Sequence, residues 1–432
     1  MKHIFPHSLS GTLKVPASKS IMQRAIAAAV LAKGESRLHN ISDCEDGLAA
    51  IEVAKALGAK IEQQGDTLTI ESNGVQPIVS EINCGEAGLG IRMFTPIAAL
   101  SDKELIIKAE GSLKTRPMHF FEEVFPKVKV QCTLQDGKAP IHIKGALQAQ
   151  NLEVDGSLSS QFLTGLLMSM ASVSMGNIIS VNHLTSRPYL DLTLSVMRDF
   201  GVKVLNFQYE KFVFPGAQRY LPQNFYIEGD WSAAAFWVVA AAIQGEITLQ
   251  GLRADSLQAD RAILDIICAA GADYTINQEG SAHFPEITIS PAKKLQAFTF
   301  DATHAPDLFP ILAVLAVHCQ GISEIKGVNR LLHKESNRAA AIVQEFQKVG
   351  ADLVIKDDIL YIHGENIPAF FAKNTYLLPN FHAHKDHRMA MALTILAHTL
   401  KIKATIDDAE CVKKSYPHFF EEVEKIGFEK EA

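Results

Sequence analysis

The chain has 432 residues, of which 47% are hydrophobic and 21% are charged, and its formal net charge at pH 7 is −7. This balance is that of an ordinary soluble globular protein, and the length predicts two or more domains, because single cores rarely grow beyond about 250–300 residues. The negative charge argues against nucleic acid as a partner, so any anion site has to be built locally.

Membrane insertion and secretion are not expected. The longest apolar runs, such as Ala233–Ile243, are shorter than the roughly eighteen residues that a membrane span needs. The segment Met1–His7 lacks the apolar core and cleavage site of a secretory signal. The cysteines are scattered without close pairs, which argues against a disulfide framework or a structural zinc and predicts reduced thiols in the cytoplasm: Cys44, Cys84, Cys132, Cys268, Cys319 and Cys411.

The first distinctive stretch is Ser18–Arg24, which runs into the alanine-rich segment Ala25–Ala32. It predicts the N-terminus of a buried helix whose first turn carries two hydroxyls and two cations. A helix start offers free backbone N–H groups and a partial positive charge, and it therefore suits a phosphate or carboxylate. The alternative is an ordinary serine-capped helix with solvated charges.

A repeat follows along the chain. Helix-like segments end at a glycine and continue into a strand-like run at nearly regular intervals, and in one copy Pro126 stands in place of the glycine; the glycines are Gly58, Gly201, Gly271, Gly350 and Gly427. Glycine suits a helix C-terminus because it adopts the left-handed conformation without a Cβ penalty. Regular recurrence predicts an array of similar units.

A second series alternates with the first. Six apolar helices, predicted to be buried because they are apolar all round, each open with a polar cluster: Ser18–Arg24, Glu86–Arg92, Ser157–Gln161, Gly229–Ser232, His304–Asp307 and Lys385–Arg388. Six units do not fit one core, so we expect two groups of three with a boundary near Tyr226–Asp230. The polar helix starts would then line a cleft between two domains, which is the default site.

The polar clusters and their loops are rich in groups that bind anions. Arginine grips carboxylate or phosphate through two parallel hydrogen bonds, and lysine adds a point charge. So many cations predict ligands with several negative charges, such as a pair of phosphorylated substrates. The set comprises Lys19, Ser20, Arg24, Lys114, Arg116, Ser159, Ser160, Gln161, Ser186, Arg187, Tyr189, Lys334, Arg338, Asp386, His387, Arg388, Lys413, Lys414 and Ser415.

Two carboxylates lie among these cations, Asp307 and Glu335. Such positioned carboxylates suit general acid–base catalysis. The alternatives are a helix cap or a salt-bridge partner. The histidines His382, His384 and His387 lack the spacing of a helical zinc site, and Gly85–Arg92 lacks the ending of a P-loop, so neither a metal nor a nucleotide is expected.

Taken together, these residues make the chain resemble the 5-enolpyruvylshikimate-3-phosphate synthase family over essentially its whole length. The resemblance is carried, in order, by Ser18–Ser20 with Arg24, Asp155–Thr164, Ser186–Tyr189, Glu228–Asp230, Pro306–Asp307, Lys334–Arg338, Asp386–Met391 and Lys414–Pro417. It implies a two-domain inside-out α/β barrel built of six βαβαββ repeats, three per domain. It also implies that residues 1–17 and 229–432 form one domain and 18–228 an inserted one, with the active site in the cleft between them.

The resemblance further implies transfer of the enolpyruvyl group of phosphoenolpyruvate to the 5-hydroxyl of shikimate 3-phosphate, with release of phosphate and no cofactor or metal. The family acts as a cytoplasmic monomer on small molecules. Its catalytic residues map to Asp307 as base, Glu335 as proton donor, Lys19 and His387. Shikimate 3-phosphate is expected at Lys19, Ser20, Arg24, Ser159, Ser160, Gln161, Ser186, Asp307 and Lys334. Phosphoenolpyruvate is expected at Lys19, Gly88, Arg116, Gln161, Arg338, Arg388 and Lys414.

The sequence departs from the family pattern at four places. Glu86 replaces the usual asparagine and Leu89 the usual threonine beside Gly88, while Arg330 replaces an asparagine and Ala17 a glycine. A carboxylate at Glu86 is unfavourable for phosphoenolpyruvate unless a cation such as Arg92 pairs with it. Glyphosate sensitivity is therefore left open.

Two rival functions remain. UDP-N-acetylglucosamine enolpyruvyltransferase, which shares the fold and the phosphoenolpyruvate chemistry, carries a cysteine on the loop that corresponds to Gly111–Pro117, and this loop has none. The chain could also be a non-catalytic anion-binding paralogue. Its only support is Glu86 and Leu89, and the presence of Asp307, Glu335 and Lys19 together argues against it.

Overall fold

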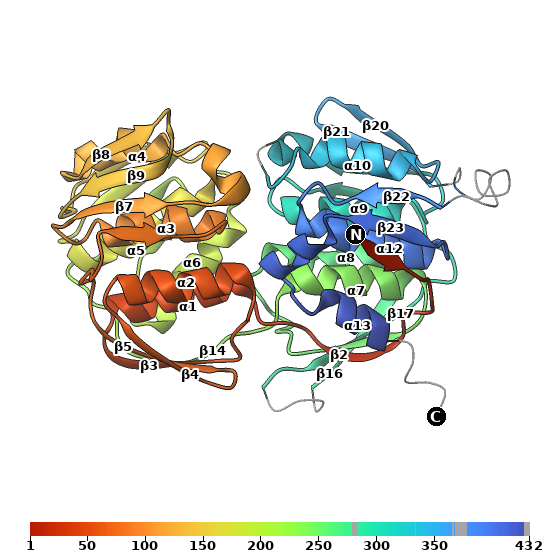
Figure 1. Cartoon of the computed structure of the whole chain (residues 1–432), viewed down its shortest axis with the longest axis horizontal. Coiled ribbons are helices and arrows are strands. Elements are labelled where there is room, and N and C mark those ends of the chain that lie inside the picture. Colours follow the sequence, from red (N-terminus) through yellow and green to blue (C-terminus); the bar gives the residue numbers. More distant parts are fainter. Residues whose placement is uncertain (279–282, 333, 365–366, 368–377, 427–432) are drawn as a thin grey trace. The chain divides into compact units, whose positions relative to one another are not determined.

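The computed structural model describes residues 1–278, 283–332, 334–364, 367 and 378–426. The chain forms two compact units (Figure 1). We call Ala17–Ile227 the inserted unit, and Met1–Pro16 together with Glu228–Ala432 the discontinuous unit. Among the described residues, no helix is both long and apolar enough to cross a membrane.

Within the described residues each unit holds three sheets, and the four-stranded sheets share one topology. A first strand pairs in parallel with a second, and a hairpin adds two antiparallel strands on the far side of the second, so the spatial order is first, second, fourth, third. A helix precedes the second strand and another helix precedes the hairpin. The repeat expected from the sequence, with a helix before each strand or hairpin, is therefore confirmed.

The inserted unit begins with the repeat α1 (Lys19–Leu31), β3 (Lys33–His39), α2 (Glu45–Ala56), β4 (Lys60–Gln64) and β5 (Thr67–Asn73), whose first strand is the distant β14 (Asn224–Tyr226). The second repeat is β6 (Glu81–Asn83), α3 (Gly88–Ala98), β7 (Glu104–Lys108), η1 (Gly111–Thr115), α4 (Phe120–Val124), η2 (Phe125–Val128), β8 (Gln131–Gln135) and β9 (Lys138–Lys144). The third is β10 (Leu152–Asp155), α5 (Ser160–Val173), β11 (Ile178–Asn182), α6 (Pro188–Asp199), β12 (Leu205–Phe207) and β13 (Lys211–Val213).

The discontinuous unit begins with β1 (Lys2–Ile4) and β2 (Gly11–Lys14), and β2 joins the repeat α7 (Trp231–Ile243), β15 (Ile247–Gln250), η3 (Ala259–Ala262), α8 (Ile263–Ala269), β16 (Asp273–Asn277) and β17 (Glu286–Ser290). The next repeat is β18 (Thr299–Asp301), η4 (Pro306–Leu308), α9 (Phe309–Ala316), β19 (Ile322–Lys326), η5 (Val328–Leu331), α10 (Arg338–Gln347), β20 (Asp352–Lys356) and β21 (Ile359–His363). The last is β22 (Asn380–His382), α12 (His387–Thr399), β23 (Ala404–Asp407), η6 (Ala409–Lys414) and α13 (Phe419–Lys425), completed by β1.

The most apolar helices form the centre of each unit. In the discontinuous unit α7, α9 and α12 contact one another, and every described residue of α9 and α12 is buried. In the inserted unit α3 contacts both α1 and α5. Such helices are buried because they have no polar face to offer to water. The α/β architecture with helices inside and sheets outside is confirmed for each unit (Figure 1).

The glycines at the helix ends have the conformation that the repeat requires, with φ of 98° at Gly58 and 83° at Gly201. A Cβ at Gly58 would lie 2.3 Å from the Gln76 carbonyl oxygen, so a side chain is excluded there as well. In the copy that carries Pro126, Lys129 takes the left-handed conformation instead, with φ of 65°. Gly427 lies outside the described residues.

Candidate active site

The polar helix starts of the discontinuous unit place a charged cluster around Arg338, the first residue of α10. The side chain of Arg338 has no exposed surface. Its Nε donates to Asp386 Oδ2 at 2.9 Å, and its Nη1 donates to Asp307 Oδ1 at 2.9 Å. Its Nη2 donates to Glu335 Oε2, also at 2.9 Å. One buried guanidinium thus holds three carboxylates that come from three different helix starts.

Asp307 lies within η4, just before α9, and its side chain is 19% exposed. Besides Arg338, it accepts from Lys334 Nζ at 3.3 Å and from Arg388 Nη2 at 3.1 Å. Burial raises the pKa of Asp307, but the charges of Arg388, Lys334 and Arg338 outweigh burial and hold that pKa well below 3.8. Asp307 is therefore ionised and sits among salt bridges, and it caps no helix with its side chain.

Glu335 faces the same cluster from the segment before α10. Its Oε1 lies 3.8 Å from Lys414 Nζ, and its side chain is 13% exposed. Lys414 ends η6 and is buried, and His387 is the buried first residue of α12. The structure thus brings together most of the residues predicted in this unit: Asp307, Lys334, Glu335, Arg338, Arg388 and Lys414.

Two further carboxylates lie in this cluster. Asp386, which the sequence placed in the polar cluster without a substrate role, caps α12 by accepting from Arg388 N at 3.0 Å while it binds Arg338. Asp260 is buried in η3 and accepts a hydrogen bond from Ser232 Oγ. Burial, reinforced by the charge of Asp307, raises the pKa of Asp260 to about 6. Asp260 was not predicted, because it carries no local signal in the sequence.

In the inserted unit, α1 presents Lys19, Ser20 and Arg24 as the sequence predicts. Lys19 Nζ pairs with Asp46 Oδ2 at 2.7 Å at the start of α2. Arg24 is fully buried and ties α1 to α6: its Nε donates to Thr193 Oγ1 at 2.9 Å and its Nη2 to Tyr189 O at 3.2 Å. Burial lowers the pKa of Arg24 to about 10. Arg24 is therefore fixed in place.

Ser186, also predicted, lies in the turn that leads into α6. Its φ of 56° is left-handed, and its carbonyl accepts from Tyr189 N at 3.2 Å. Ser186 is buried. Because Tyr189 O is also an acceptor for Arg24, the turn that holds Ser186 is tied to the start of α1.

The starts of α3 and α5 form the second polar group of the inserted unit. Ser159 caps α5 by accepting from Gln161 N at 3.2 Å, and Ser160 is the buried first residue of that helix. Gln161 Oε1 accepts from Arg92 Nη1 at 2.8 Å. A Cβ placed on Gly88 would lie 3.1 Å from Arg116 Nη1 and 3.2 Å from Arg92 Nη1, so two guanidinium groups border this glycine. Gly88, Arg116 and Gln161 are thus brought together.

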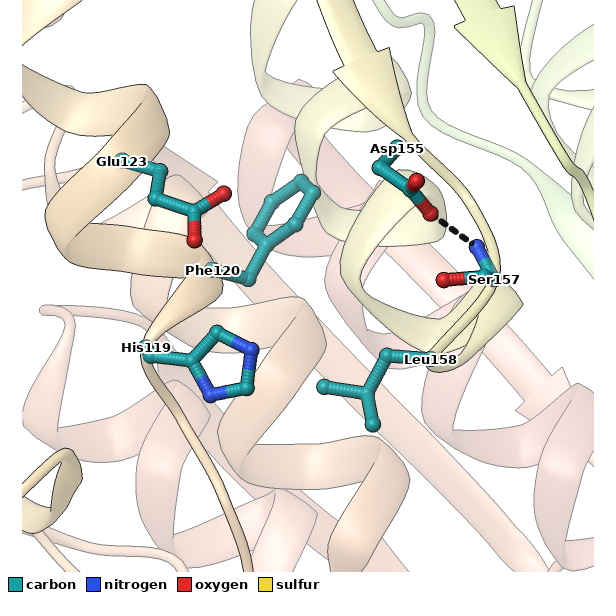
Figure 2. Close-up of a pocket in the computed structure, with 6 residues that line it drawn as sticks. All are labelled: His119, Phe120, Glu123, Asp155, Ser157 and Leu158. Atoms are coloured by element: carbon teal, nitrogen blue, oxygen red, sulfur yellow. Dashed lines mark hydrogen bonds between the residues drawn. The ribbon is translucent and has the colours of Figure 1, made fainter.

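A pocket of about 270 Å³ lies beside this group in the inserted unit (Figure 2). It is lined from the α4 side by His119, Phe120 and Glu123, and from the loop between β10 and α5 by Asp155, Ser157 and Leu158. Asp155 Oδ1 accepts from Ser157 N at 2.7 Å, which shapes the loop just before Ser159. None of the six residues belongs to the predicted site.

Of the three predicted histidines, His382 and His384 form local contacts. His384 N donates to His382 Nδ1 at 2.9 Å, and His384 Nε2 lies 3.1 Å from Glu345 Oε1. The described part of the chain holds no group of three or more His, Cys, Asp or Glu side chains arranged for a metal ion.

The fold is shared with solved enolpyruvyl transferases. The structure superposes on EPSP synthase from Acinetobacter baumannii with a TM-score of 0.82 and 24% sequence identity, covering 98% of each chain. The enolpyruvyl transferase NikO from Streptomyces tendae matches with a TM-score of 0.75 and 17% identity, covering 98% of this chain and 97% of that one. At these identities the likeness concerns the fold alone, and it confirms the predicted fold class.

Sequence comparisons identify the family to which the chain belongs. The family model for EPSP synthase (3-phosphoshikimate 1-carboxyvinyltransferase) matches residues 5–423. The 3-phosphoshikimate 1-carboxyvinyltransferase of Clostridium kluyveri is 36% identical over 429 residues, covering 99% of this chain and 97% of that protein. The enzyme of the same name from Clostridium beijerinckii is 34% identical, covering 98% and 97%. The chain belongs to the EPSP synthase family.

Proposed function

We propose that this protein is an enzyme that transfers the carboxyvinyl group of phosphoenolpyruvate to the 5-hydroxyl of shikimate 3-phosphate and releases phosphate. The reaction lies on the shikimate pathway to chorismate and the aromatic amino acids. The observation that carries the proposal is the Arg338 cluster, in which three carboxylates and several cations converge within a chain that matches the family almost end to end. Neither oxidation nor reduction is involved, and no cofactor is invoked.

Asp307 and Glu335 divide the proton transfers. Asp307 accepts the proton of the 5-hydroxyl while the hydroxyl oxygen attacks C2 of phosphoenolpyruvate. Glu335 gives a proton to the C3 methylene, and the product of this addition is a tetrahedral ketal. Glu335, now ionised, takes a proton back from the new methyl group as the C2–O bond to phosphate breaks, and the proton held by Asp307 leaves with the phosphate. Lys414, 3.8 Å from Glu335, and Arg388, 3.1 Å from Asp307, stabilise the negative charge on the carboxylate and the leaving phosphate.

The depressed pKa of Asp307 makes it a weak base in the free protein, since a general base works best with a pKa near the operating pH. Anionic substrates compete for the same cations. When phosphoenolpyruvate engages Arg338 and Arg388, the attraction that these groups exert on Asp307 weakens and its pKa rises. We propose that substrate binding in this way turns Asp307 into an effective base, and that buried His387 orients its neighbours.

The inserted unit supplies the remaining substrate contacts in this proposal. Its helix starts offer hydroxyls, amides and cations to two anionic ligands. Shikimate 3-phosphate binds Lys19, Ser20, Arg24, Ser159, Ser160, Gln161 and Ser186 together with Lys334 and Asp307. Phosphoenolpyruvate binds Lys19, Arg116, Gln161 and the backbone of Gly88 together with Arg338, Arg388 and Lys414.

Two alternatives give distinct outcomes. A UDP-N-acetylglucosamine enolpyruvyltransferase would accept the nucleotide sugar in place of shikimate 3-phosphate, and a non-catalytic paralogue would bind shikimate 3-phosphate without turnover. The loop Gly111–Pro117 has no cysteine, and the paired carboxylates at Arg338 support turnover. The first point argues against the nucleotide sugar as the acceptor, and the second argues against the non-catalytic paralogue. We also propose that the protein is cytoplasmic, in line with its six free cysteines, and that it is a monomer. Light scattering of the purified protein measures the oligomeric state.

The test is phosphate release by purified protein given phosphoenolpyruvate, with and without shikimate 3-phosphate. The proposal predicts release that needs both substrates and scales with enzyme concentration. Release with UDP-N-acetylglucosamine as the acceptor would instead support the rival enzyme. Binding of shikimate 3-phosphate without any release would support the silent paralogue.

A further inference from the structure

Two loops of the second repeat of the inserted unit are joined along their length. The segment before α3 and the segment after β7 are linked by Cys84 N donating to Lys108 O at 3.0 Å and by Glu110 N donating to Gly85 O at 2.8 Å. Asn83 Nδ2 adds a side-chain bond to Glu110 Oε1 at 2.6 Å. The two segments are therefore held together by hydrogen bonds as far as Gly85 and Glu110.

Glu86 continues this connection with its side chain. Ser112 Oγ donates to Glu86 Oε2 at 3.3 Å. Gly111 has a left-handed φ of 47°, and a Cβ built on it would lie 1.6 Å from Glu86 Oε1. The carboxylate of Glu86 therefore lies directly against the backbone at the start of η1, in space that a side chain at residue 111 would occupy.

The two segments joined by Glu86 end at residues that we propose to bind phosphoenolpyruvate. Gly88 follows Glu86 by two positions and begins α3, while Arg116 follows the η1 turn that Glu86 contacts. A Cβ at Gly88 would lie 3.1 Å from Arg116 Nη1. Buried Arg116 thus reaches back to the glycine that the Glu86 segment positions. A change in the contact between Glu86 and η1 would alter the distance between Gly88 and Arg116.

We propose that Glu86 is a positioning residue for phosphoenolpyruvate binding: its carboxylate fixes η1 against the start of α3 and so holds Arg116 beside Gly88. This inference rests on the proposed function. It reverses the expectation drawn from charge alone, in which an acidic residue near the pocket weakens the binding of an anion. Here the carboxylate accepts a hydrogen bond from Ser112 and lies against Gly111, and its effect on the substrate acts through Arg116.

Two variants separate positioning from charge. Glu86→Ala removes the contact with η1, and we expect the KM for phosphoenolpyruvate to rise about tenfold while the KM for shikimate 3-phosphate stays within about twofold. Glu86→Gln keeps an acceptor for Ser112 and loses the charge, so its KM values should stay near those of the wild type. If the carboxylate instead repels phosphoenolpyruvate, both variants would lower that KM, and the inference would be overturned. Glu35→Ala, which alters an exposed carboxylate of the same unit, is the control.

A double-mutant cycle tests the route through η1. Ser112→Ala should raise the KM for phosphoenolpyruvate about threefold, in line with the loss of one hydrogen bond. If Glu86 acts through Ser112, the double variant should be little worse than Glu86→Ala, because interacting residues are not additive. Independent, multiplicative effects of the two changes on this KM would contradict a shared role.

A structural measurement does not depend on turnover. Hydrogen exchange of the Leu113 and Arg116 amides, which bond to Glu110 O and Leu113 O, should accelerate in Glu86→Ala and not in Glu86→Gln. Unchanged exchange in Glu86→Ala would overturn the inference, whatever reaction the protein catalyses. Failure of the wild-type protein to transfer the carboxyvinyl group would instead overturn the proposed function and leave this exchange result to decide the role of Glu86.

Discussion

Arg338 and Asp386 form an ion pair in which neither side chain has any exposed surface, with Nε 2.9 Å from Oδ2. The same guanidinium also binds Asp307 and Glu335, to which we assign the two proton transfers. Burying charges is costly unless each is paired and hydrogen-bonded. The pair therefore fixes Arg338 in a position from which it donates hydrogen bonds to both Asp307 and Glu335. Removing Asp386 should disturb both stability and catalysis.

Asp386→Asn tests this pair. Asparagine still caps α12, so the change mainly removes the one fully buried carboxylate among the three that pair with Arg338. Breaking a buried ion pair from one side costs about 3–5 kcal/mol, and we expect the free energy of unfolding in urea to fall by that order. Asp230→Asn, which changes the cap of the equivalent helix α7, should cost less than about 1 kcal/mol. Equal losses in the two variants would show that capping, rather than the ion pair, is what matters.

Glu335→Ala tests the proton donor. We expect kcat to fall at least about a hundredfold, which is the scale of general acid–base catalysis. Circular dichroism checks that the fold is kept, and the Kd for shikimate 3-phosphate should change little. The matched control is Glu410→Ala, because Glu410 also pairs with a lysine, Lys413, at 2.7 Å but is exposed. Turnover unchanged from the wild type would remove Glu335 from the mechanism.

Asp260 should leave a mark on the pH profile. Its pKa of about 6 means that it carries charge at pH 8 and loses it near pH 5, beside Asp307 and Arg388. Asp260→Asn imitates the protonated form. The ratio of wild-type to variant kcat/KM should therefore differ from one at pH 8 and approach one below about pH 6. Measuring both proteins on the same substrates cancels the titration of the substrates, and a ratio independent of pH would contradict the expectation.

Two histidines, half-buried His318 and buried His398, should make the protein sensitive to acid. Burial lowers the pKa of His318 and of His398 to about 4, whereas the unfolded chain titrates near 6.5. Between these values the unfolded state binds more protons, so stability falls as the pH drops from about 6.5 to about 4. Each group accounts for a loss on the order of 3 kcal/mol over that window. Urea unfolding of His318→Gln should show a smaller loss than the wild type, while exposed His183→Gln should match the wild type.

Arg24→Lys tests the fixed arginine of α1. Lysine cannot reproduce the three donors that Arg24 directs to Thr193 Oγ1, Tyr189 O and Ser20 O. We expect the KM for shikimate 3-phosphate to rise at least about tenfold, with a smaller change for phosphoenolpyruvate. Arg37→Lys, an exposed substitution in the same unit, should leave both constants unchanged. A uniform rise in both KM values for Arg24→Lys would indicate general disruption of the unit.

Local patterns made the repeats and much of the site predictable. The glycines that end helices and the apolar helices reflect rules that act within one or two turns of chain, and they are found in the structure at Gly58 and in α9. The residues around Arg338 were found because motif matching located them one by one. Their mutual contacts could not be read from spacing, because they come from separate repeats.

Long-range pairing is what the sequence conceals. β2 pairs with β15 through Leu13 and Leu249, and β14 pairs with β3, although long stretches of chain separate the partners. No change in composition marks the boundary between the two units at Pro16–Ala17, because the chain on both sides of it is ordinary loop. Asp260 was missed for the same reason: its place beside Asp307 arises from tertiary packing alone.

The central claim is that the bond broken in phosphoenolpyruvate is the one between carbon and oxygen. The most direct measurement follows phosphoenolpyruvate labelled with ¹³C at C2 by NMR, in the presence of shikimate 3-phosphate and the purified protein. The account predicts that the label appears as an enol ether on a product that keeps its 3-phosphate, together with one equivalent of inorganic phosphate. Labelled pyruvate together with a second phosphate on the cyclohexene ring would mean that the phosphoryl group was transferred with cleavage between phosphorus and oxygen, and would contradict this prediction.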